Sequence, residues 1–264
     1  MNDISNPIIS DFKINEDLVW QMSRAEKYSL IEILRSLKPE VSLEIGTYMG
    51  GSLQVLSKFS SSVYSIDISG EPEKFLKNTF KNVKFLKGKS KELINPTISK
   101  IIESNNKLEF ILIDGDHSKN GVKNDLNEIL KFKYKNPLTI ILHDSFNPSC
   151  RRGIKSIDYK NFPNVEYIDL DYVSGSFSPN DDYREMWGGF CIIKINPEST
   201  KVAKVNSSQN ELYKSSYLLS VHLLKDIFFF LKPLKRLVYN LLGIRKKQDF
   251  YFNFNKWFFN DSIK

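Results

Sequence analysis

The sequence predicts an α/β protein with a doubly wound sheet, mostly parallel with an antiparallel last strand. Five short apolar runs of strand length recur between residues 41 and 144, and stretches that suit helices separate them. A glycine-rich turn follows the first run directly. Strands that alternate with helices indicate βαβ units, which form a parallel sheet with helices on both faces. We expect this domain over residues 1–200 and a basic, amphipathic helical extension over residues 201–264.

An amphipathic helix over residues 17–37 is the first expected element. Asp17 stands where a helix cap is expected. The apolar positions recur near helical spacing, at Leu18, Met22, Ala25, Ile33, Leu34 and Leu37. We therefore predict an N-terminal helix that begins near Asp17.

Seven strands are expected after this helix. The five of the parallel sheet are VSLEIG from Val41, SVYSID from Ser62, VKFLKG from Val83, LEFILID from Leu108 and LTIILHD from Leu138. Two more, VEYIDLDY and WGGFCIIKI, bracket a long loop rich in serine, proline, aspartate and glycine. Since long loops in compact domains are usually functional or disordered, this loop is a candidate substrate-binding segment.

The C-terminal extension carries the basic excess of the chain. Residues 201–264 hold twelve lysines and arginines against four acidic residues, whereas residues 1–200 are almost neutral, so the extension accounts for the net charge of +7. A polar linker is expected first, and then a helical, amphipathic stretch with a kink or a new helix at Pro233. His222 is read as an ordinary face residue of this helix. Its apolar face suits packing on the domain or a second subunit, and residues 217–259 also suit a membrane interface.

Composition narrows the function classes. A hydrophobic content of 41% is enough for a full core. Cys150 and Cys191 are widely spaced, which disfavours a disulfide framework or a cysteine zinc site. The first residues resemble no signal peptide and no uncharged run is long enough to span a bilayer, so we expect a cytoplasmic protein. Because the basic residues gather in the extension, we expect no nucleic-acid partner.

The glycine-rich turn LEIGTYMGGS indicates a nucleotide-like cofactor. Gly46, Gly50 and Gly51 allow the backbone to approach a ligand closely at the start of a helix. Asp67 ends the second expected strand, at a distance along the chain where an acid meets ribose hydroxyls. The spacing departs from the G-x-G-x-x-G of dinucleotide sites, with Glu44 two positions ahead of Gly46, which disfavours a nicotinamide cofactor. A tight turn with Asp67 as a cap is the alternative.

A second group of polar residues follows the fourth and fifth strands. Asp114 and His117 come after one strand, and His143 and Asp144 end the next. Adjacent parallel strands would bring these residues together beside the glycine turn. Charged groups there are costly unless they are solvated, paired or bound to a metal, so we predict a working site. Alternatively, the two histidines only form hydrogen bonds and cap the following elements while Asp116 pairs with a lysine.

Glu44-x-Gly46-x-x-x-Gly50-Gly51, with Asp67 closing the second strand, resembles motif I and the ribose acid of class I S-adenosylmethionine (SAM) dependent methyltransferases. The resemblance covers residues 20–196 and implies a Rossmann-like fold. The segments IDGDHS and ILHD are similar to those of one branch, which includes metal-assisted sugar O-methyltransferases of the mycinamicin type and cephalosporin hydroxylase-like proteins. The resemblance implies SAM contacts from Glu44, Gly46, Thr47, Tyr48, Gly50, Ser52, Asp67 and Asp114, and adenine contacts from Gly88, Lys89 and Ser90.

Methyl transfer to a hydroxyl needs a deprotonated oxygen, and a divalent ion lowers the pKa of a bound hydroxyl. Asp114 and Asp144 suit Mg²⁺ or Mn²⁺, and His143 as the third ligand suits Mn²⁺ or a mixed site. His117 is the expected general base, since its ordinary pKa lies near neutrality, and the resemblance supports this division of roles. The related enzymes have a glutamate in place of His143, which leaves the third ligand and the metal open.

The long loop and its flanks suit a polyol acceptor. They hold a mixture of polar and aromatic side chains, namely Tyr172, Asp181, Asp182, Tyr183, Arg184 and Trp187. Trp187 is equally suited to packing. We expect a SAM-dependent O-methyltransferase for a carbohydrate or glycosylated acceptor, acting as a homo-oligomer. If the extension lies on a membrane, a lipid-linked glycan is the natural acceptor. A diverged hydroxylase-like enzyme and a non-catalytic membrane-associated relative are the alternatives.

Overall fold

The chain is described by a computed structural model over residues 12–178, 184–200, 203–228 and 230. Within these residues an eight-stranded sheet has the order β10-β6-β9-β5-β4-β1-β2-β3, and β7 and β8 form a separate hairpin. The strands are β1 (Val41–Ile45), β2 (Ser62–Asp67), β3 (Val83–Lys87), β4 (Leu108–Ile113), β5 (Leu138–His143), β6 (Val165–Val173), β7 (Ser176–Phe177), β8 (Met186–Trp187), β9 (Phe190–Ile195) and β10 (Val205–Asn206).

Strand directions confirm the predicted fold class. The five strands from β1 to β5 pair in parallel, as expected for βαβ units. Strand β9 lies antiparallel between β5 and β6. The carboxyl ends of β1, β2, β4 and β5 therefore meet at one edge of the sheet, where the candidate site residues follow.

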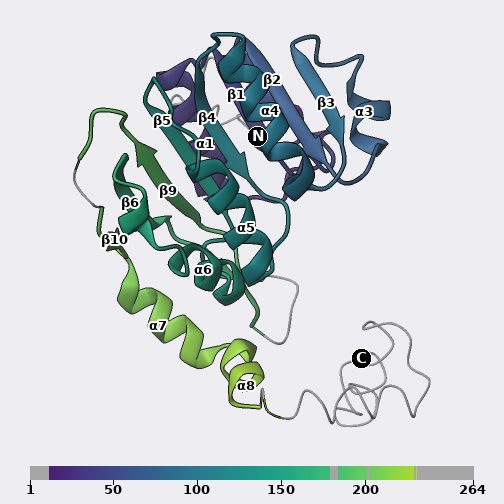
Figure 1. Cartoon of the computed structure of the whole chain (residues 1–264). Coiled ribbons are helices and arrows are strands. Elements are labelled where there is room, and N and C mark those ends of the chain that lie inside the picture. The colour runs from purple at the N-terminus through teal and green to yellow at the C-terminus, as the bar shows by residue number, and fades with distance from the viewer. Residues whose placement is uncertain (1–11, 179–183, 201–202, 229, 231–264) are drawn as a thin grey trace, which may run out of the picture.

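Helices cover both faces of the sheet (Figure 1). They are α1 (Arg24–Leu37), α2 (Leu53–Phe59), α3 (Glu71–Leu76), α4 (Ser90–Glu103), α5 (Lys119–Leu130), α6 (Pro148–Lys155), α7 (Asn210–Leu219) and α8 (Val221–Ile227). Along β4, Ile111 and Ile113 pack with α4, α5 and α6, whereas Phe110 and Leu112 pack with α1 and α2. This alternation gives two apolar layers, one on each face.

The N-terminal helix begins seven residues later than predicted, at Arg24 instead of Asp17, because a stronger cap lies inside the expected range. The Ser23 hydroxyl accepts from the Glu26 backbone N–H, and the Glu26 carboxylate accepts from the Ser23 N–H. This reciprocal capping box satisfies two backbone donors that a start at Asp17 leaves unsupported. Trp20 and Met22 precede the helix and are buried against its cluster.

The C-terminal segment is tied to the sheet and to α6. Residues 205–206, expected as part of a polar linker, pair with β6 instead, which corrects that prediction. Buried Arg151 donates to both carboxylate oxygens of Asp171, at 2.6 and 3.1 Å, and to the Ser207 hydroxyl at 2.6 Å. Its guanidinium also lies 3.9 Å from the ring centre of Tyr213 in α7. These contacts hold the start of the extension against the domain.

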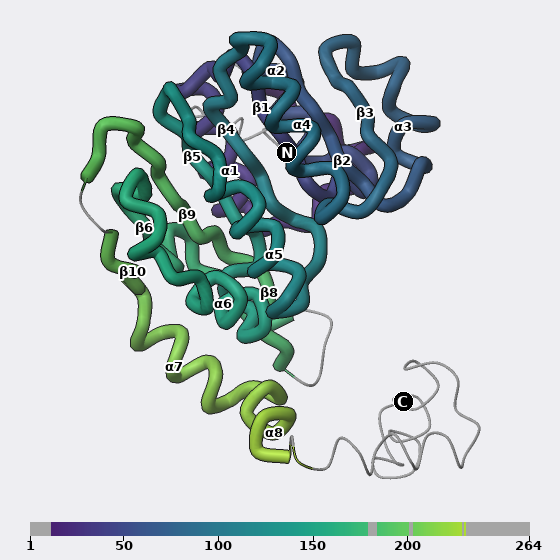
Figure 2. Tube along the Cα trace, in the orientation of Figure 1, coloured from purple at the N-terminus to yellow at the C-terminus, as the bar shows by residue number. Residues whose placement is uncertain are grey.

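The predicted amphipathic helix is broken at Ser220, whose hydroxyl accepts from the His222 N–H and starts α8. His222 itself is buried, and its Nε2 accepts from the Met186 N–H at 3.3 Å. Figure 2 traces the chain from β10 through α7 to α8, below α6. Among the described residues, no helix has the length and apolarity to cross a membrane. Pro233 and most of the segment 217–259 lie outside the described residues.

Candidate active site

The glycine turn lies in direct contact with the end of β4. Gly46 has φ +92°, and a Cβ at this position would lie 2.1 Å from the Asp114 carbonyl oxygen. The Asp114 N–H in turn donates to the Ile45 carbonyl at 2.8 Å. Glycine is therefore required at position 46 both for its backbone angle and for space. The contact also places the predicted cofactor turn and the polar cluster side by side.

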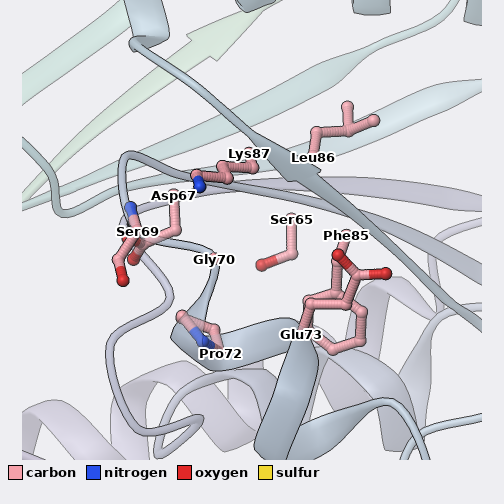
Figure 3. Close-up of a pocket in the computed structure, with 9 residues that line it drawn as sticks. All are labelled: Ser65, Asp67, Ser69, Gly70, Pro72, Glu73, Phe85, Leu86 and Lys87. Atoms are coloured by element: carbon pink, nitrogen blue, oxygen red, sulfur yellow. Dashed lines mark hydrogen bonds between the residues drawn. The ribbon is translucent and has the colours of Figure 1, made fainter.

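Asp67 holds the glycine turn from the end of β2. Its Oδ2 accepts from the backbone N–H groups of Thr47 and Tyr48, at 2.9 and 3.0 Å, and its Oδ1 accepts from Ser69 at 2.8 Å. A hollow opens beside this carboxylate (Figure 3), between the ends of β2 and β3 and the start of α3. Asp67, Gly70 and Lys87 are among the residues that line it. Asp67 therefore caps the glycine turn, as the alternative expects, and it also lines the hollow.

Glu44 is fully buried beneath the turn. Its carboxylate accepts hydrogen bonds from the hydroxyls of Ser52, at 2.6 Å, and Ser65, at 2.8 Å. Burial raises the pKa of Glu44 to about 7, although both hydroxyls favour the ionised form. A side chain with no exposed surface acts on a ligand only through its partners. Glu44 therefore positions Ser52 and Ser65. The Ser65 hydroxyl in turn lies 2.5 Å from the Thr47 hydroxyl and positions that group.

We expect the unfolding free energy of Glu44→Gln, relative to the wild type, to rise with pH. The folded pKa of about 7 exceeds the ordinary 4.5, so the stabilising contribution of Glu44 is full below pH 4.5 and is lost as the pH rises through 7. The shift corresponds to about 3 kcal/mol, and glutamine does not titrate. Denaturant unfolding at pH 5 and pH 8 measures the change. Glu103→Gln, at an exposed position, is the matched control, and an equal effect of Glu44→Gln at both pH values would contradict the assignment.

The predicted adenine segment lies at the end of β3, next to Asp67. The Gly88 N–H donates to the Asp67 carbonyl at 2.8 Å, and Lys89 is the N-cap residue of α4. The Ser90 hydroxyl instead donates to Asp125 in α5, at 2.7 Å. Gly88 and Lys89 thus border the predicted cofactor turn, whereas the Ser90 side chain is engaged in holding α4 to α5.

The four predicted polar residues after β4 and β5 converge. Asp114 Oδ1 lies 2.9 Å from His143 Nδ1 and 3.3 Å from His117 Nε2. Asp144 Oδ2 lies 3.2 Å from His117 Nε2 and 3.6 Å from His143 Nδ1. The convergence follows from the parallel pairing of β4 with β5, which aligns their carboxyl ends. Asp116 points elsewhere, and its Oδ1 accepts from the N–H of Ser118, the N-cap residue of α5.

Glu26 of α1 is a member of this cluster that the sequence did not predict. Its Oε1 lies 3.1 Å from His143 Nε2 and accepts from the Gly189 N–H at 2.6 Å. The carboxylate is buried, although it comes from a helix on the opposite face of the sheet from α5. The capping-box pattern Ser23-x-x-Glu26 is a visible sequence signal, but it indicates a helix start and gives no sign of a contact with His143.

The Gly188-Gly189 turn before β9 fixes two of the carboxylates. The Gly188 N–H donates to Asp144 Oδ1 at 2.6 Å, and the Gly189 N–H donates to Glu26. Both glycines have positive φ, +72° and +82°. Asp144 also has a positive φ of 58°, which is uncommon for a residue with a side chain and is typical of functional sites.

The charges of the cluster stabilise one another. Burial disfavours the charged form of His143, but the Asp114 and Asp144 carboxylates outweigh it and hold its pKa well above 6.5. Burial likewise opposes ionisation of Asp114, yet the two histidines lower its pKa to about 2. The hydrogen bond to Asp114 raises the pKa of His117, while burial raises that of Asp144. Since the side chain of His117 is 40% exposed, it is the member of the cluster that solvent reaches most easily.

Trp187 borders the cluster on the loop side. Its ring packs edge-on against His117, with ring centres 5.6 Å apart, and its Nε1 donates to Glu185. Glu185 also pairs with Lys225 of α8. Tyr172 is exposed at the end of β6, and Arg184 is exposed beside β8. The predicted acceptor residues Asp181, Asp182 and Tyr183 lie outside the described residues.

Comparison with known proteins identifies the domain that holds these residues. Residues 43–145 match a protein family described as a methyltransferase domain. The match runs from β1 to the residue after Asp144, so it contains the glycine turn and the residues of the cluster that follow β4 and β5. The match agrees with the prediction of a methyltransferase domain over these residues.

An uncharacterized protein of Acanthamoeba polyphaga mimivirus is 33% identical to this chain over 153 residues, which is 52% of this chain and 62% of the viral protein. The chain thus matches less than two thirds of the length of this relative.

Solved structures agree with the fold. The O-methyltransferase TomG of Streptomyces achromogenes, solved with SAM, has a TM-score of 0.50 and 14% identity, with 69% of this chain and 83% of that chain covered. An O-methyltransferase of Bacillus cereus, solved with S-adenosylhomocysteine, has a TM-score of 0.47 and 18% identity, covering 68% and 84%. The chain shares the fold of TomG.

Proposed function

We propose that this chain, whose residues 43–145 match a methyltransferase domain, transfers the methyl group of SAM to a hydroxyl oxygen of a carbohydrate or glycosylated acceptor. The observation that carries the proposal is the contact between Gly46 and the Asp114 carbonyl. This contact places the glycine turn, which suits SAM, next to the cluster that contains His117 as the proposed base. A methyl donor and a proton acceptor are thereby held at one edge of the sheet.

The glycine turn and its supports are proposed to bind SAM. The backbone N–H groups of Thr47 and Tyr48 donate to Asp67, which lines the hollow and whose carboxylate suits ribose hydroxyls. Ser52, fixed by Glu44, is proposed to face the methionine portion, and Gly88 and Lys89 the adenine. The proposal gives Gly50 only a conformational role, since its φ is +80°.

His117 is proposed to take the proton of the acceptor hydroxyl. The acceptor oxygen attacks the methyl carbon of SAM, and the carbon–sulfur bond breaks with its electron pair left on sulfur. The products are the methyl ether and S-adenosylhomocysteine, and the hydroxyl proton passes to His117. The exposed fraction of this side chain gives a substrate access to it, and Asp114 and Asp144 stabilise the imidazolium that forms.

Asp114, His143 and Asp144 are proposed to hold a divalent ion, Mg²⁺ or Mn²⁺. They offer three ligand atoms that all lie within 4.8 Å of one another. Donor atoms bound to one ion at about 2.1 Å are about 3 Å apart when their bonds are perpendicular, so the residues fit such an ion. A bound ion supplies Lewis acidity that lowers the pKa of a nearby hydroxyl. His117 Nε2 lies 3.2 Å from Asp144 Oδ2, so His117 is close enough to the three proposed ligands to take the proton of the acceptor hydroxyl.

A carbohydrate acceptor is favoured by Trp187, which contacts His117, and by exposed polar side chains on the two segments that flank the long loop. Trp187 offers an apolar ring face, and Tyr172 and Arg184 offer exposed polar groups for hydroxyl recognition. Such a mixture suits a sugar ring, which has both apolar faces and polar edges. If residues 217–259 contact a membrane surface, the sugar would be part of a lipid-linked glycan.

Calorimetric titration with SAM and transfer of labelled methyl groups to a panel of glycans and glycosylated small molecules test the proposal. We expect SAM binding and formation of a methyl ether in the presence of Mg²⁺ or Mn²⁺. Binding of SAM without methyl transfer to any acceptor would favour the alternative hypothesis of a diverged, hydroxylase-like enzyme. Failure to bind SAM would contradict the proposal.

A further inference from the structure

We propose that Glu26 and His143 form a carboxylate–histidine pair that makes the cation site select Mn²⁺ over Mg²⁺. The inference rests on the proposed function, because it concerns the same cation site. It assigns a positioning role to a residue of α1, outside the segment 43–145 that matches the methyltransferase domain. It also decides which of the two candidate ions the site prefers.

The two ring nitrogens of His143 face different partners. Nε2 faces Glu26 Oε1 at 3.1 Å, while Nδ1 faces Asp114 Oδ1 at 2.9 Å and Asp144 Oδ2 at 3.6 Å. An ionised carboxylate only accepts hydrogen bonds, so the contact with Glu26 assigns a proton to Nε2. In the charged ring Nδ1 donates its proton to Asp114, and a cation that replaced this proton would meet the Nδ1 lone pair together with the two aspartates. Three electron-rich atoms that converge in this way suit a cation between them.

Glu26 is held too firmly to follow another partner. Its side chain is buried, with Oε2 accepting from the Ser23 N–H at 2.5 Å and Oε1 from the Gly189 N–H at 2.6 Å. The capping box of α1 and the turn before β9 thus hold the carboxylate against Nε2 from two sides. A histidine that ligates a metal commonly donates its other N–H to such a carboxylate, which fixes the ring and increases its basicity.

The ligand atoms of the site, one imidazole nitrogen and two carboxylate oxygens, determine whether Mn²⁺ or Mg²⁺ binds more tightly. Mg²⁺ is a hard ion that favours oxygen ligands and retains several waters. An imidazole nitrogen whose basicity is increased by Glu26 contributes more to binding a first-row transition-metal ion, which accepts nitrogen and oxygen together. A site with His143 between two aspartates is therefore better matched to Mn²⁺ than to Mg²⁺.

Metal titration of the full chain tests the inference without an acceptor. The protein is stripped with a chelator, Mn²⁺ binding is followed by the electron paramagnetic resonance signal of the free ion, and Mg²⁺ is added as competitor. For the wild type we expect Mn²⁺ to bind at least on the order of tenfold more tightly than Mg²⁺. Glu26→Gln is expected to weaken Mn²⁺ binding about 10- to 100-fold. His143→Glu is expected to bring the Mn²⁺/Mg²⁺ ratio close to one.

Ser23→Ala is the matched control for the helix. It removes the hydroxyl that accepts from the Glu26 N–H, but it leaves the Glu26 carboxylate beside His143. We expect this variant to bind Mn²⁺ as the wild type does. A Glu26→Gln effect that Ser23→Ala reproduces would mean a general loss of helix α1 and would overturn the positioning role.

Two other results would overturn the inference. One is a wild type that binds Mg²⁺ as tightly as Mn²⁺, or that binds neither ion, which would leave His143 as a charged partner of three carboxylates. The other is an unchanged Mn²⁺/Mg²⁺ ratio in both Glu26→Gln and His143→Glu. Selective Mn²⁺ binding without methyl transfer would uphold the inference and contradict the proposed function, so the two failures are distinguishable.

Discussion

Replacing His117 with asparagine is expected to lower kcat for methyl transfer about 10²- to 10⁴-fold. Asparagine is still able to hydrogen bond to Asp114 and Asp144, the two carboxylates that His117 Nε2 approaches at 3.3 and 3.2 Å. It is not able to accept the proton of the acceptor hydroxyl. The loss should therefore appear in kcat, with SAM affinity unchanged. Single-turnover methyl transfer and calorimetric SAM binding measure the two quantities.

His222→Asn is the matched control for this variant. His222 is buried and accepts from the Met186 N–H, and it lies in α8 outside the cluster. We expect it to retain wild-type methyl transfer. A His117→Asn variant with unchanged kcat would remove His117 from the mechanism. If instead the variant lost Mn²⁺ binding together with activity, His117 would be a metal ligand and not the base.

Asp114→Asn is expected to lower kcat/KM by at least about 100-fold and to abolish Mn²⁺ binding. Asp114 Oδ1 contacts both histidines of the cluster, and their positive charges lower its pKa to about 2, so it is ionised at every pH of interest. The amide keeps the shape but removes the charge that a cation and His143 share. Methyl transfer with and without a chelator, together with Mn²⁺ titration, measures the loss.

Asp116→Asn provides the control for Asp114, because Asp116 lies two residues further on and accepts from the N–H of Ser118, the N-cap residue of α5. This variant should bind Mn²⁺ and transfer methyl groups as the wild type does. A chelator should lower the activity of the wild type and of Asp116→Asn, but should have no further effect on Asp114→Asn. A wild type that keeps its activity after complete metal removal, while Asp114→Asn stays impaired, would refute the metal assignment.

Local sequence pattern was sufficient to predict most of the sheet. The runs that begin at Val41, Ser62, Val83, Leu108 and Leu138 are strands β1 to β5, and all five pair in parallel. Apolar composition and regular spacing carry this information because β1, β2, β4 and β5 are buried on both faces, and only β3, at the edge of the sheet, is half-exposed. The start of α1 was misplaced for a related reason. Residues 17–22 are apolar enough to be buried, but burial alone does not distinguish an extended segment from a helix.

Some residues of the candidate site were likewise predicted from local sequence pattern, and others were not. The members that directly follow strands, Asp67, Asp114, His143 and Asp144, were predicted because parallel strands end at a common edge. Glu26 and Ser65 were missed. Ser65 faces Glu44 from the neighbouring strand, and the sequence of β2 carries no sign of that contact.

The sequence by itself therefore determined the order of strands and helices, the glycine turn and the set of residues at the carboxyl edge. These depend on interactions that are local or repeated along the chain. Only the tertiary structure decided that Glu26 of α1 meets His143, that Gly188 and Gly189 hold two carboxylates, and that Arg151 fixes the start of the extension. Such contacts join residues far apart in the chain, and their energies depend on packing and burial, which exist only once the layers have assembled.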